Sequence, residues 1–86
     1  MEHQLKIRRE YLIDILDGIK TFEVRRDDRG FKVGDILVLN ERIPAEDLDR
    51  FGDYTGNRIK VMVSYLFYMR ELGNESDYCV MGIVVL

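Results

Sequence analysis

Four polar residues stand close together between Gly18 and Arg25. They are Lys20, Thr21, Glu23 and Arg25, which combine three ionisable side chains with a hydroxyl. Because alternate residues of a strand lie about 7 Å apart on one face, the last three would form a polar row, with Lys20 at its entrance. A guanidinium beside a carboxylate can present planar donors to a phosphate or a base edge, and Glu23 could accept from a base amino group. The row therefore suits contact with a nucleotide.

The same spacing also fits an ordinary ion pair on a wet surface, which contributes only about 0 to 1 kcal/mol and is very common. A strand over Thr21 to Arg25 places Phe22 and Val24 on the face opposite the polar row. If those two apolar residues pack into the core, the row must face solvent, a partner strand or a cleft. Only a cleft would make it a site, and spacing alone favours the surface ion pair.

The net charge of the chain is -3, which argues against a protein that coats nucleic acid by bulk electrostatics. The charge is uneven: Lys20 to Lys32 holds five basic and three acidic residues, whereas Val33 to Asn57 holds two basic and six acidic ones. A solvated charged surface is the simplest explanation of that asymmetry. Any contact with RNA must therefore be local.

Other catalytic and metal chemistry has little support. Cys79 is the single cysteine and His3 the single histidine, so neither a disulfide nor a zinc site is expected. Every Ser-His or Cys-His pair would have to use His3, which makes a conventional hydrolytic triad a poor hypothesis. We expect no cofactor and no metal, and we expect Cys79 to be a small buried hydrophobe.

The polar row needs neighbouring elements to position it. Gln4 to Arg8 alternates as a half-buried strand does, and from Arg9 the spacing becomes helical until Gly18, a typical C-cap. Thr21 to Arg25 then forms the second strand. The helix is expected to bury an apolar stripe made of Leu12, Ile15, Leu16 and Ile19.

Later segments supply three more strands. The segment Ile36 to Leu39 is typical of a strand covered on both faces. The segment Glu41 to Asn57 is expected to be a long excursion from the sheet, with a helical turn near Ala45 to Asp49. The longest strand is Arg58 to Arg70, and after a Gly73-Asn74 turn the last strand is Tyr78 to Leu86. The longest strand carries apolar residues at period two, namely Ile59, Val61, Val63, Tyr65 and Phe67. The aromatic residues Tyr65, Phe67, Tyr68 and Tyr78 are expected to pack at the core and its rim, although they could stack on bases.

These elements predict an α+β, mainly β domain of about five strands, with one helix between the first two strands. At 86 residues the chain holds a single domain, residues 1–86. Five strands can curl into a small, partly closed barrel, but the pattern alone does not distinguish a barrel from a flat α+β sandwich. Its apolar stretches are far shorter than the ~20 residues that cross a bilayer, and the start carries no secretory pattern, so we expect a cytoplasmic protein without a membrane partner.

The string GIKTFEVR resembles the signature of the ASCH family, Gly-x-Lys-x-x-Glu-x-Arg, at Gly18, Lys20, Glu23 and Arg25. The following RGFKVGDILVLNE is similar to the next strand of that family. The segments HQLKI and YTGNRI look like a short, uncharacterised branch found in bacteria and phages. Together these matches cover nearly the whole chain.

The resemblance implies a PUA-like barrel that binds RNA in a cleft where Lys20, Glu23 and Arg25 converge. By the same resemblance, Lys6 of the first strand would contribute to the cleft. Tyr54 and Arg58 of the YTGNRI segment would offer a stacking platform and a phosphate contact. Whether the chain is an enzyme stays open, and a binding module without catalysis is the leading hypothesis.

Two alternatives come from other classes of function. A second ASCH branch removes the acetyl group from N4-acetylcytidine with a lysine, a threonine and a glutamate. Here Lys20 matches the lysine, but Glu23 stands at the threonine position, and the longer insertion that supplies the glutamate is missing. A small amidohydrolase would then use Lys20 as the amine and Glu23 as acid or base. The third hypothesis is a bacterial or phage adaptor that binds a protein through Glu41 to Asn57.

Overall fold

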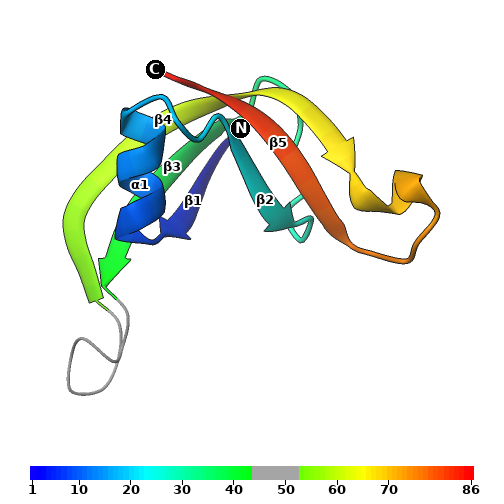
Figure 1. Ribbon diagram of the computed structural model, residues 1–86, viewed down its shortest axis with the longest axis horizontal. Coiled ribbons are helices and arrows are strands. Elements are labelled where there is room, and N and C mark those ends of the chain that lie inside the picture. Colours follow the sequence, from blue (N-terminus) through cyan, green and yellow to red (C-terminus); the bar gives the residue numbers. More distant parts are fainter. Residues whose placement is uncertain (44–52) are drawn as a thin grey trace.

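The computed structural model describes residues 1–43 and 53–86 of the chain, which form a strongly curved sheet with one α-helix (Figure 1). The elements in chain order are β1 (Glu2–Ile7), α1 (Arg9–Leu16), β2 (Phe22–Arg26), β3 (Ile36–Ile43), β4 (Asp53–Tyr68), the 3-10 helix η2 (Met69–Leu72) and β5 (Tyr78–Val85). The predicted fold class is therefore confirmed: five strands, with the α-helix between the first two. No helix in the described ranges is long and apolar enough to cross a membrane.

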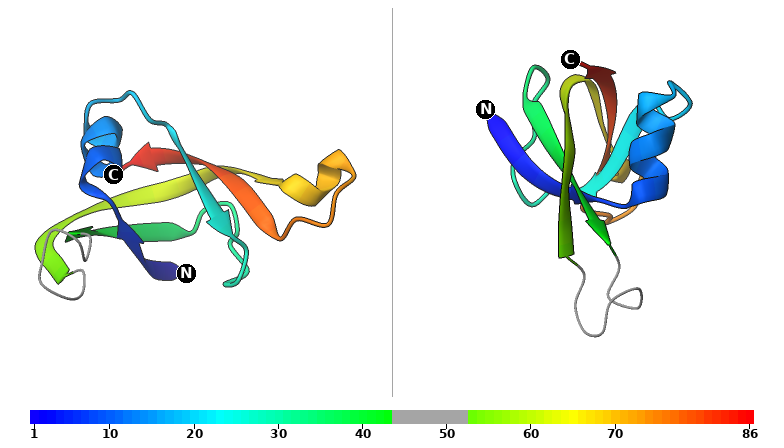
Figure 2. Two further views of the ribbon diagram at one scale, coloured as in Figure 1. Left: turned by 60° about the horizontal axis from the view of Figure 1, so that its bottom comes forward. Right: turned by 90° about the vertical axis from the view of Figure 1, so that its left-hand side faces the viewer.

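The strand order is β1-β3-β4-β5-β2, in which β1 and β3 run parallel and the other neighbours antiparallel. The sheet curls into a half-barrel (Figure 2), so that its two edge strands, β1 and β2, approach each other. The place where β1 and β2 approach is the seam of the half-barrel. Arginine side chains, rather than a ladder of backbone hydrogen bonds, bridge it. Arg25 donates to the backbone oxygen of Lys6 at 2.6 Å, and Arg29 donates to that of Gln4 at 2.9 Å.

The core lies on the inner face of the half-barrel, where alternate residues of each strand are buried. In β5 these residues are Cys79, Met81 and Ile83, so Cys79 is a buried hydrophobe as predicted. Burial, followed by the charges of Asp27 and Asp28, raises the pKa of its thiol. In β3, three consecutive residues, Leu37 to Leu39, are buried, which confirms a strand covered on both faces.

The helix α1 covers the inner face with Leu12 and Ile15, which join the core. It ends at Leu16, and Gly18 follows with a φ of 75°, the left-handed conformation expected of a C-cap glycine. The predicted apolar stripe is too long: Leu16 and Ile19 are exposed. Leu16 is the last residue of the helix and borders an open pocket between α1 and the sheet, and Ile19 lies beyond the end of the helix.

The strand β4 differs from its prediction in two ways. It begins at Asp53, and β3 continues to Ile43, so both ends of the predicted excursion are strand, while the predicted turn at Ala45 to Asp49 lies outside the described residues. A register shift between Val63 and Tyr65 then exchanges the two faces. After it, Leu66 and Tyr68 pack against the core, whereas Tyr65 and Tyr78 are exposed. The single face predicted from Ile59 to Phe67 is therefore wrong beyond the bulge.

Candidate functional site

The strand β2 turns its charged face inward. Glu23 is 2% exposed, whereas Phe22 and Val24 are 45% and 49% exposed, so the condition considered from the sequence, that these two apolar residues pack into the core, is not met. The physical reason is the position of β2 at the edge of a half-barrel. Its inner face looks onto the seam, where other side chains can neutralise a buried carboxylate.

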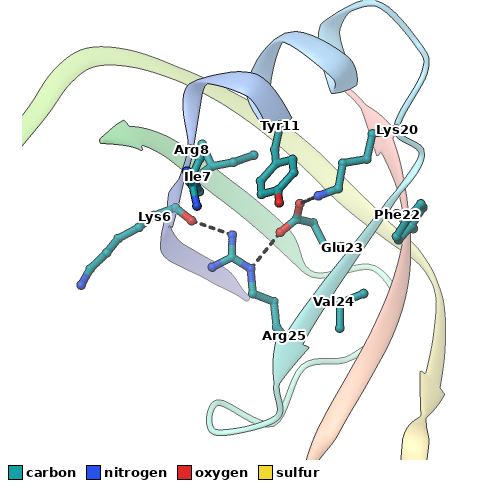
Figure 3. A pocket seen from close by; sticks show the side chains of 9 residues that line it. All are labelled: Lys6, Ile7, Arg8, Tyr11, Lys20, Phe22, Glu23, Val24 and Arg25. Atoms are coloured by element: carbon teal, nitrogen blue, oxygen red, sulfur yellow. Dashed lines mark hydrogen bonds and ion pairs between the residues drawn. The ribbon is translucent and has the colours of Figure 1, made fainter. Parts of the chain in front are cut away.

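Two cations neutralise Glu23 (Figure 3). Lys20 Nζ lies 2.5 Å from one carboxylate oxygen, and Arg25 Nε lies 2.8 Å from the other. The side chains of Lys20 and Arg25 are 17% and 24% exposed, so both remain accessible from solvent. Because both of its oxygens are engaged, Glu23 is suited to orient these cations rather than to accept a hydrogen bond from a base.

Lys20 also lies against two aromatic rings. Its Nζ is 4.8 Å from the ring centroid of Tyr11 in α1 and 5.6 Å from that of Phe22 in β2. An ammonium at such distances is attracted by the negative face of a ring. The lysine is therefore held from the helix side, from the strand side and by the carboxylate of Glu23.

These residues border a pocket of about 490 Å³ between the start of α1 and β2. Its lining combines four cationic side chains, one carboxylate, two aromatic rings and two aliphatic residues: Lys6, Arg8, Lys20, Arg25, Glu23, Tyr11, Phe22, Ile7 and Val24. Such a volume is ordinary for a small-molecule site. Three of the predicted residues, Lys20, Glu23 and Arg25, are brought together here as expected.

Five residues of the pocket lining were not predicted as site residues, namely Ile7, Phe22, Val24, Arg8 and Tyr11. The two that come from outside β1 and β2 are Arg8 and Tyr11. They stand at the start of α1, where the sequence contains no signal that places them opposite Lys20. Arg8 forms an exposed ion pair with Glu10. Such a pair is ordinary at the start of a helix and does not by itself indicate a site. Their place in the pocket depends on how α1 packs across the sheet, which periodicity does not report.

The other predicted site residues are distributed differently. Lys6 lines the pocket and accepts from Arg25 through its backbone oxygen, while its side chain points away from Glu23 (Figure 3). Thr21 is exposed and is not part of the pocket lining. Tyr54 and Arg58 lie on β4, which is separated from β2 by β5, so the structure does not bring them to this pocket.

Arg58 instead borders a second pocket of about 380 Å³ between α1 and the sheet. The buried carboxylate there is Glu41, which accepts from the Thr55 hydroxyl at 2.7 Å and from Arg9 Nε at 3.3 Å. The Thr55 hydrogen bond and then Arg9 hold the pKa of Glu41 below its usual value, against the opposing effect of burial. Asn57 adds a further donor at 3.3 Å.

The third buried carboxylate, Asp35, is held by hydrogen bonds near the start of the chain. It lies 2.8 Å from His3 Nε2 and accepts from the N-terminal amine and from the backbone N–H of Lys32. The His3 hydrogen bond is the largest cause that lowers the pKa of Asp35, and burial opposes it. Among the described residues, no group of three or more histidine, cysteine or acidic side chains is arranged to hold a metal ion.

The geometry defines a class: a curved half-barrel domain with a basic pocket beside the seam of its two edge strands. Sequence comparison then gives the family. Residues 2–83 match the family described as "Domain of unknown function (DUF3850)", and the chain belongs to that family.

Two similar proteins extend the comparison. The "Uncharacterized 12.9 kDa protein in GpA 3'region" of Escherichia phage P2 is 29% identical over 62 residues, which are 72% of this chain and 50% of that protein. The chain thus spans about half the length of the curated relative that it matches. The crystal structure of "hypothetical protein PH0355" superimposes with a TM-score of 0.66 at 18% identity over all of both chains, so the two share a fold.

Proposed function

We propose that this chain is an RNA-binding module that takes up part of a nucleotide in the pocket around Lys20, Glu23 and Arg25. The observation that carries the proposal is the charge of the lining: four cations and one carboxylate, in a chain whose net charge is -3. A local excess of positive charge in an acidic protein favours a small anionic ligand over bulk coating of a polyanion. A nucleotide within RNA supplies such an anion.

The aromatic residues of the pocket support the same ligand class. Tyr11 and Phe22 are about half exposed beside the Lys20 ammonium, so each offers ring surface for stacking. Stacking of a base on an aromatic side chain is worth about 1 to 3 kcal/mol and tolerates any base. Cations for the phosphate and rings for the base are the two elements by which proteins hold single-stranded RNA.

The resemblance of GIKTFEVR to the ASCH signature adds the expectation of RNA as the nucleic acid and of a PUA-like barrel as the fold family. Within this proposal, Lys20 and Arg25 contact the nucleotide, and Glu23 holds both in position. Lys6 adds positive charge at the pocket edge. Tyr54 and Arg58 lie on β4, away from the pocket, so within this proposal they would contact RNA only beyond the nucleotide held there.

The test measures binding of a fluorescent single-stranded RNA by anisotropy at several salt concentrations. Arg25→Ala should weaken binding about tenfold or more, because it removes a charge-assisted contact. Arg26→Ala is the matched control: Arg26 is the next residue of β2, is paired with Asp77 at 2.8 Å, and lies outside the pocket lining. Both variants change the net charge equally. Equal affinity of the two variants, or salt-independent binding, would refute the proposal.

Arg25→Ala also removes a partner of Glu23, so a second variant separates binding from folding. The Lys6 residue is exposed and contributes to the seam through its backbone, so Lys6→Ala leaves those hydrogen bonds in place. It should keep the melting temperature and reduce the affinity and the salt slope. An unchanged affinity and slope would count against the pocket.

The amidohydrolase hypothesis is tested by a separate assay. Release of acetate from N4-acetylcytidine, lost in Lys20→Gln, would indicate the amidohydrolase. The Lys20 ammonium is already engaged by the carboxylate of Glu23 in the folded chain. The adaptor hypothesis rests on Glu41 to Asn57, most of which lies outside the described residues.

A further inference from the structure

The pocket presents mainly hydrogen-bond donors to a ligand. Both oxygens of Glu23 are already bound, one by Lys20 and one by Arg25. Lys20 has three N–H donors and uses one on Glu23, and Arg25 has five and uses two, on Glu23 and on the Lys6 oxygen. The remaining donors of both cations can be used by a ligand, and a phosphate offers more acceptor atoms than a base edge does.

The net positive charge of the pocket lining is larger than the single negative charge of one phosphodiester. Its lining holds Lys6, Arg8, Lys20 and Arg25 against Glu23, a formal excess of three positive charges. If Glu10, which pairs with Arg8 at 2.8 Å, is counted against the lining, an excess of two remains. An internal phosphodiester of RNA carries one negative charge, whereas a terminal phosphate monoester carries about −1.5 to −2 at neutral pH.

The size of the pocket and its closure on one side also favour a chain end. About 490 Å³ is the volume of a small-molecule site and not of a groove that follows several nucleotides. The hydrogen bond from Arg25 to Lys6 crosses the seam beside the pocket, and that from Arg29 to Gln4 crosses it further along. These two links tie β1 to β2, so a strand of RNA has no passage through the seam.

We propose that the pocket recognises the terminal phosphate monoester of an RNA, with the adjoining base on Tyr11 or Phe22, and discriminates against internal phosphodiesters. This inference rests on the proposed function, because it names the part of the RNA that the same pocket takes. Lys20 and Arg25 contact the phosphate, and Glu23 is a positioning residue that keeps the two cations apart and directed toward it. Lys6, whose side chain points away from Glu23, and Arg8, which pairs with Glu10, supply additional positive charge at the pocket edge.

The experiment compares short RNAs of one sequence that carry a 5′-phosphate, a 3′-phosphate or hydroxyls at both ends. We expect one monophosphorylated RNA to bind about tenfold more tightly than the hydroxyl RNA, since it adds about 1.5 to 2 negative charges within reach of several cations. The two phosphorylated forms identify which end is bound. The matching mononucleotide should compete with the preferred RNA, whereas the nucleoside should not.

The pH dependence tests whether the dianion is recognised. The second pKa of a phosphate monoester is about 6, so the terminal group keeps one negative charge at pH 5, and the preference should fall from about tenfold to about threefold between pH 7.5 and pH 5. Arg8→Ala should reduce the preference more than it reduces binding of the hydroxyl RNA, and Arg26→Ala should leave the preference unchanged. Arg8 is exposed and lies outside the Glu23 cluster, so its removal is not expected to unfold the chain.

The outcomes separate this inference from the proposed function. If all three RNAs bind equally and Arg25→Ala weakens each of them, the pocket binds RNA and the inference is wrong. If the preference stays about tenfold at the lower pH, recognition does not depend on the second charge and the inference is also wrong. If no RNA binds at any salt concentration, the proposed function and the inference fail together.

Discussion

Arg25 of β2 donates from Nη2 to the backbone oxygen of Lys6 in β1 at 2.6 Å, although these two strands are not neighbours in the sheet. The same guanidinium donates from Nε to Glu23 at 2.8 Å. One side chain therefore fixes a buried carboxylate and an unpaired edge carbonyl at once. Because exposed edge carbonyls are templates for unwanted strand pairing, the arginines also protect the edge of β1.

The second arginine of the seam gives a prediction about local stability. Arg29→Ala removes the hydrogen bond to the oxygen of Gln4, at a cost of about 0.5 to 1 kcal/mol for an exposed link. Hydrogen exchange of β1 amides should become faster, while exchange in β4, the central strand of the sheet, should stay as in the wild type. Arg70→Ala, in η2, is the control. Unchanged exchange in β1 would show that Arg29 does not hold the seam.

Removal of the Glu23 charge should be costly. Glu23→Gln leaves Lys20 and Arg25 close together without their shared counter-ion, and we expect a loss of about 2 to 3 kcal/mol, reduced by the partial exposure of both cations. Urea unfolding measures it. Glu2→Gln is the matched control, since Glu2 is exposed and 3.7 Å from Lys60, and it should cost about 0.5 kcal/mol or less.

A double-mutant cycle extends this test. Combining Glu23→Gln with Lys20→Met should cost less than the sum of the two single substitutions, because the two side chains interact directly. We expect a coupling free energy of about 1 to 2 kcal/mol. Additive effects would contradict the ion pair as a stabilising interaction.

The buried carboxylates predict acid lability. Interactions in the folded chain lower the pKa of Asp35 from 3.8, mainly through His3, and that of Glu41 from 4.5, mainly through Thr55. The unfolded chain therefore takes up protons first as the pH falls. The stability that these groups supply is complete above pH 4.5 and is lost as the pH falls through their lower folded-state values.

Two variants test this dependence by urea unfolding at a series of pH values. Asp35→Asn and Glu41→Gln should each be less stable than the wild type at neutral pH and should show a shallower loss of stability in acid. Thr55→Val should raise the pKa of Glu41 in the folded chain and so reduce its contribution at neutral pH, because it removes the 2.7 Å hydrogen bond. A double variant, Asp35→Asn with Glu41→Gln, that retains the full acid slope would refute the assignment.

Close packing at the bulge of β4 gives a further prediction. A Cβ atom at Gly82 would lie 3.1 Å from Ser64 Oγ and 3.2 Å from Tyr65 Cβ, so a larger residue forces β4 and β5 apart. Gly82→Val should cost about 1 to 3 kcal/mol, and Gly82→Ala less, as measured by thermal unfolding. Val84→Thr, at an exposed position of the same strand, should change stability by about 0.5 kcal/mol or less.

The fold could largely be predicted from the sequence because the signals for its elements are local. Period-two alternation identified the strands, and helical spacing before Gly18 identified α1, since both follow from backbone geometry over a few residues. The cluster of polar residues after Gly18 indicated Lys20, Glu23 and Arg25, which lie together in the structure. The apolar strand around Cys79 indicated that this residue is buried.

The direction of each strand face was decided by tertiary structure. Alternation shows that Glu23 and Phe22 lie on opposite faces, but not which face is inside. The apolar face of β2 is the exposed one, because Lys20 and Arg25 neutralise Glu23 at the seam. Likewise, the bulge after Val63 reverses the face of β4.

The full set of residues that line the pocket could not be predicted from the sequence for the same reason. Arg8 and Tyr11 reach it through the packing of α1, and Arg25 reaches Lys6 only because the sheet curls until its two edges meet. Sequence spacing determines which residues share a strand or a helix turn, since those distances are fixed by the backbone. Contacts between separate elements depend on curvature and packing, which are properties of the whole chain.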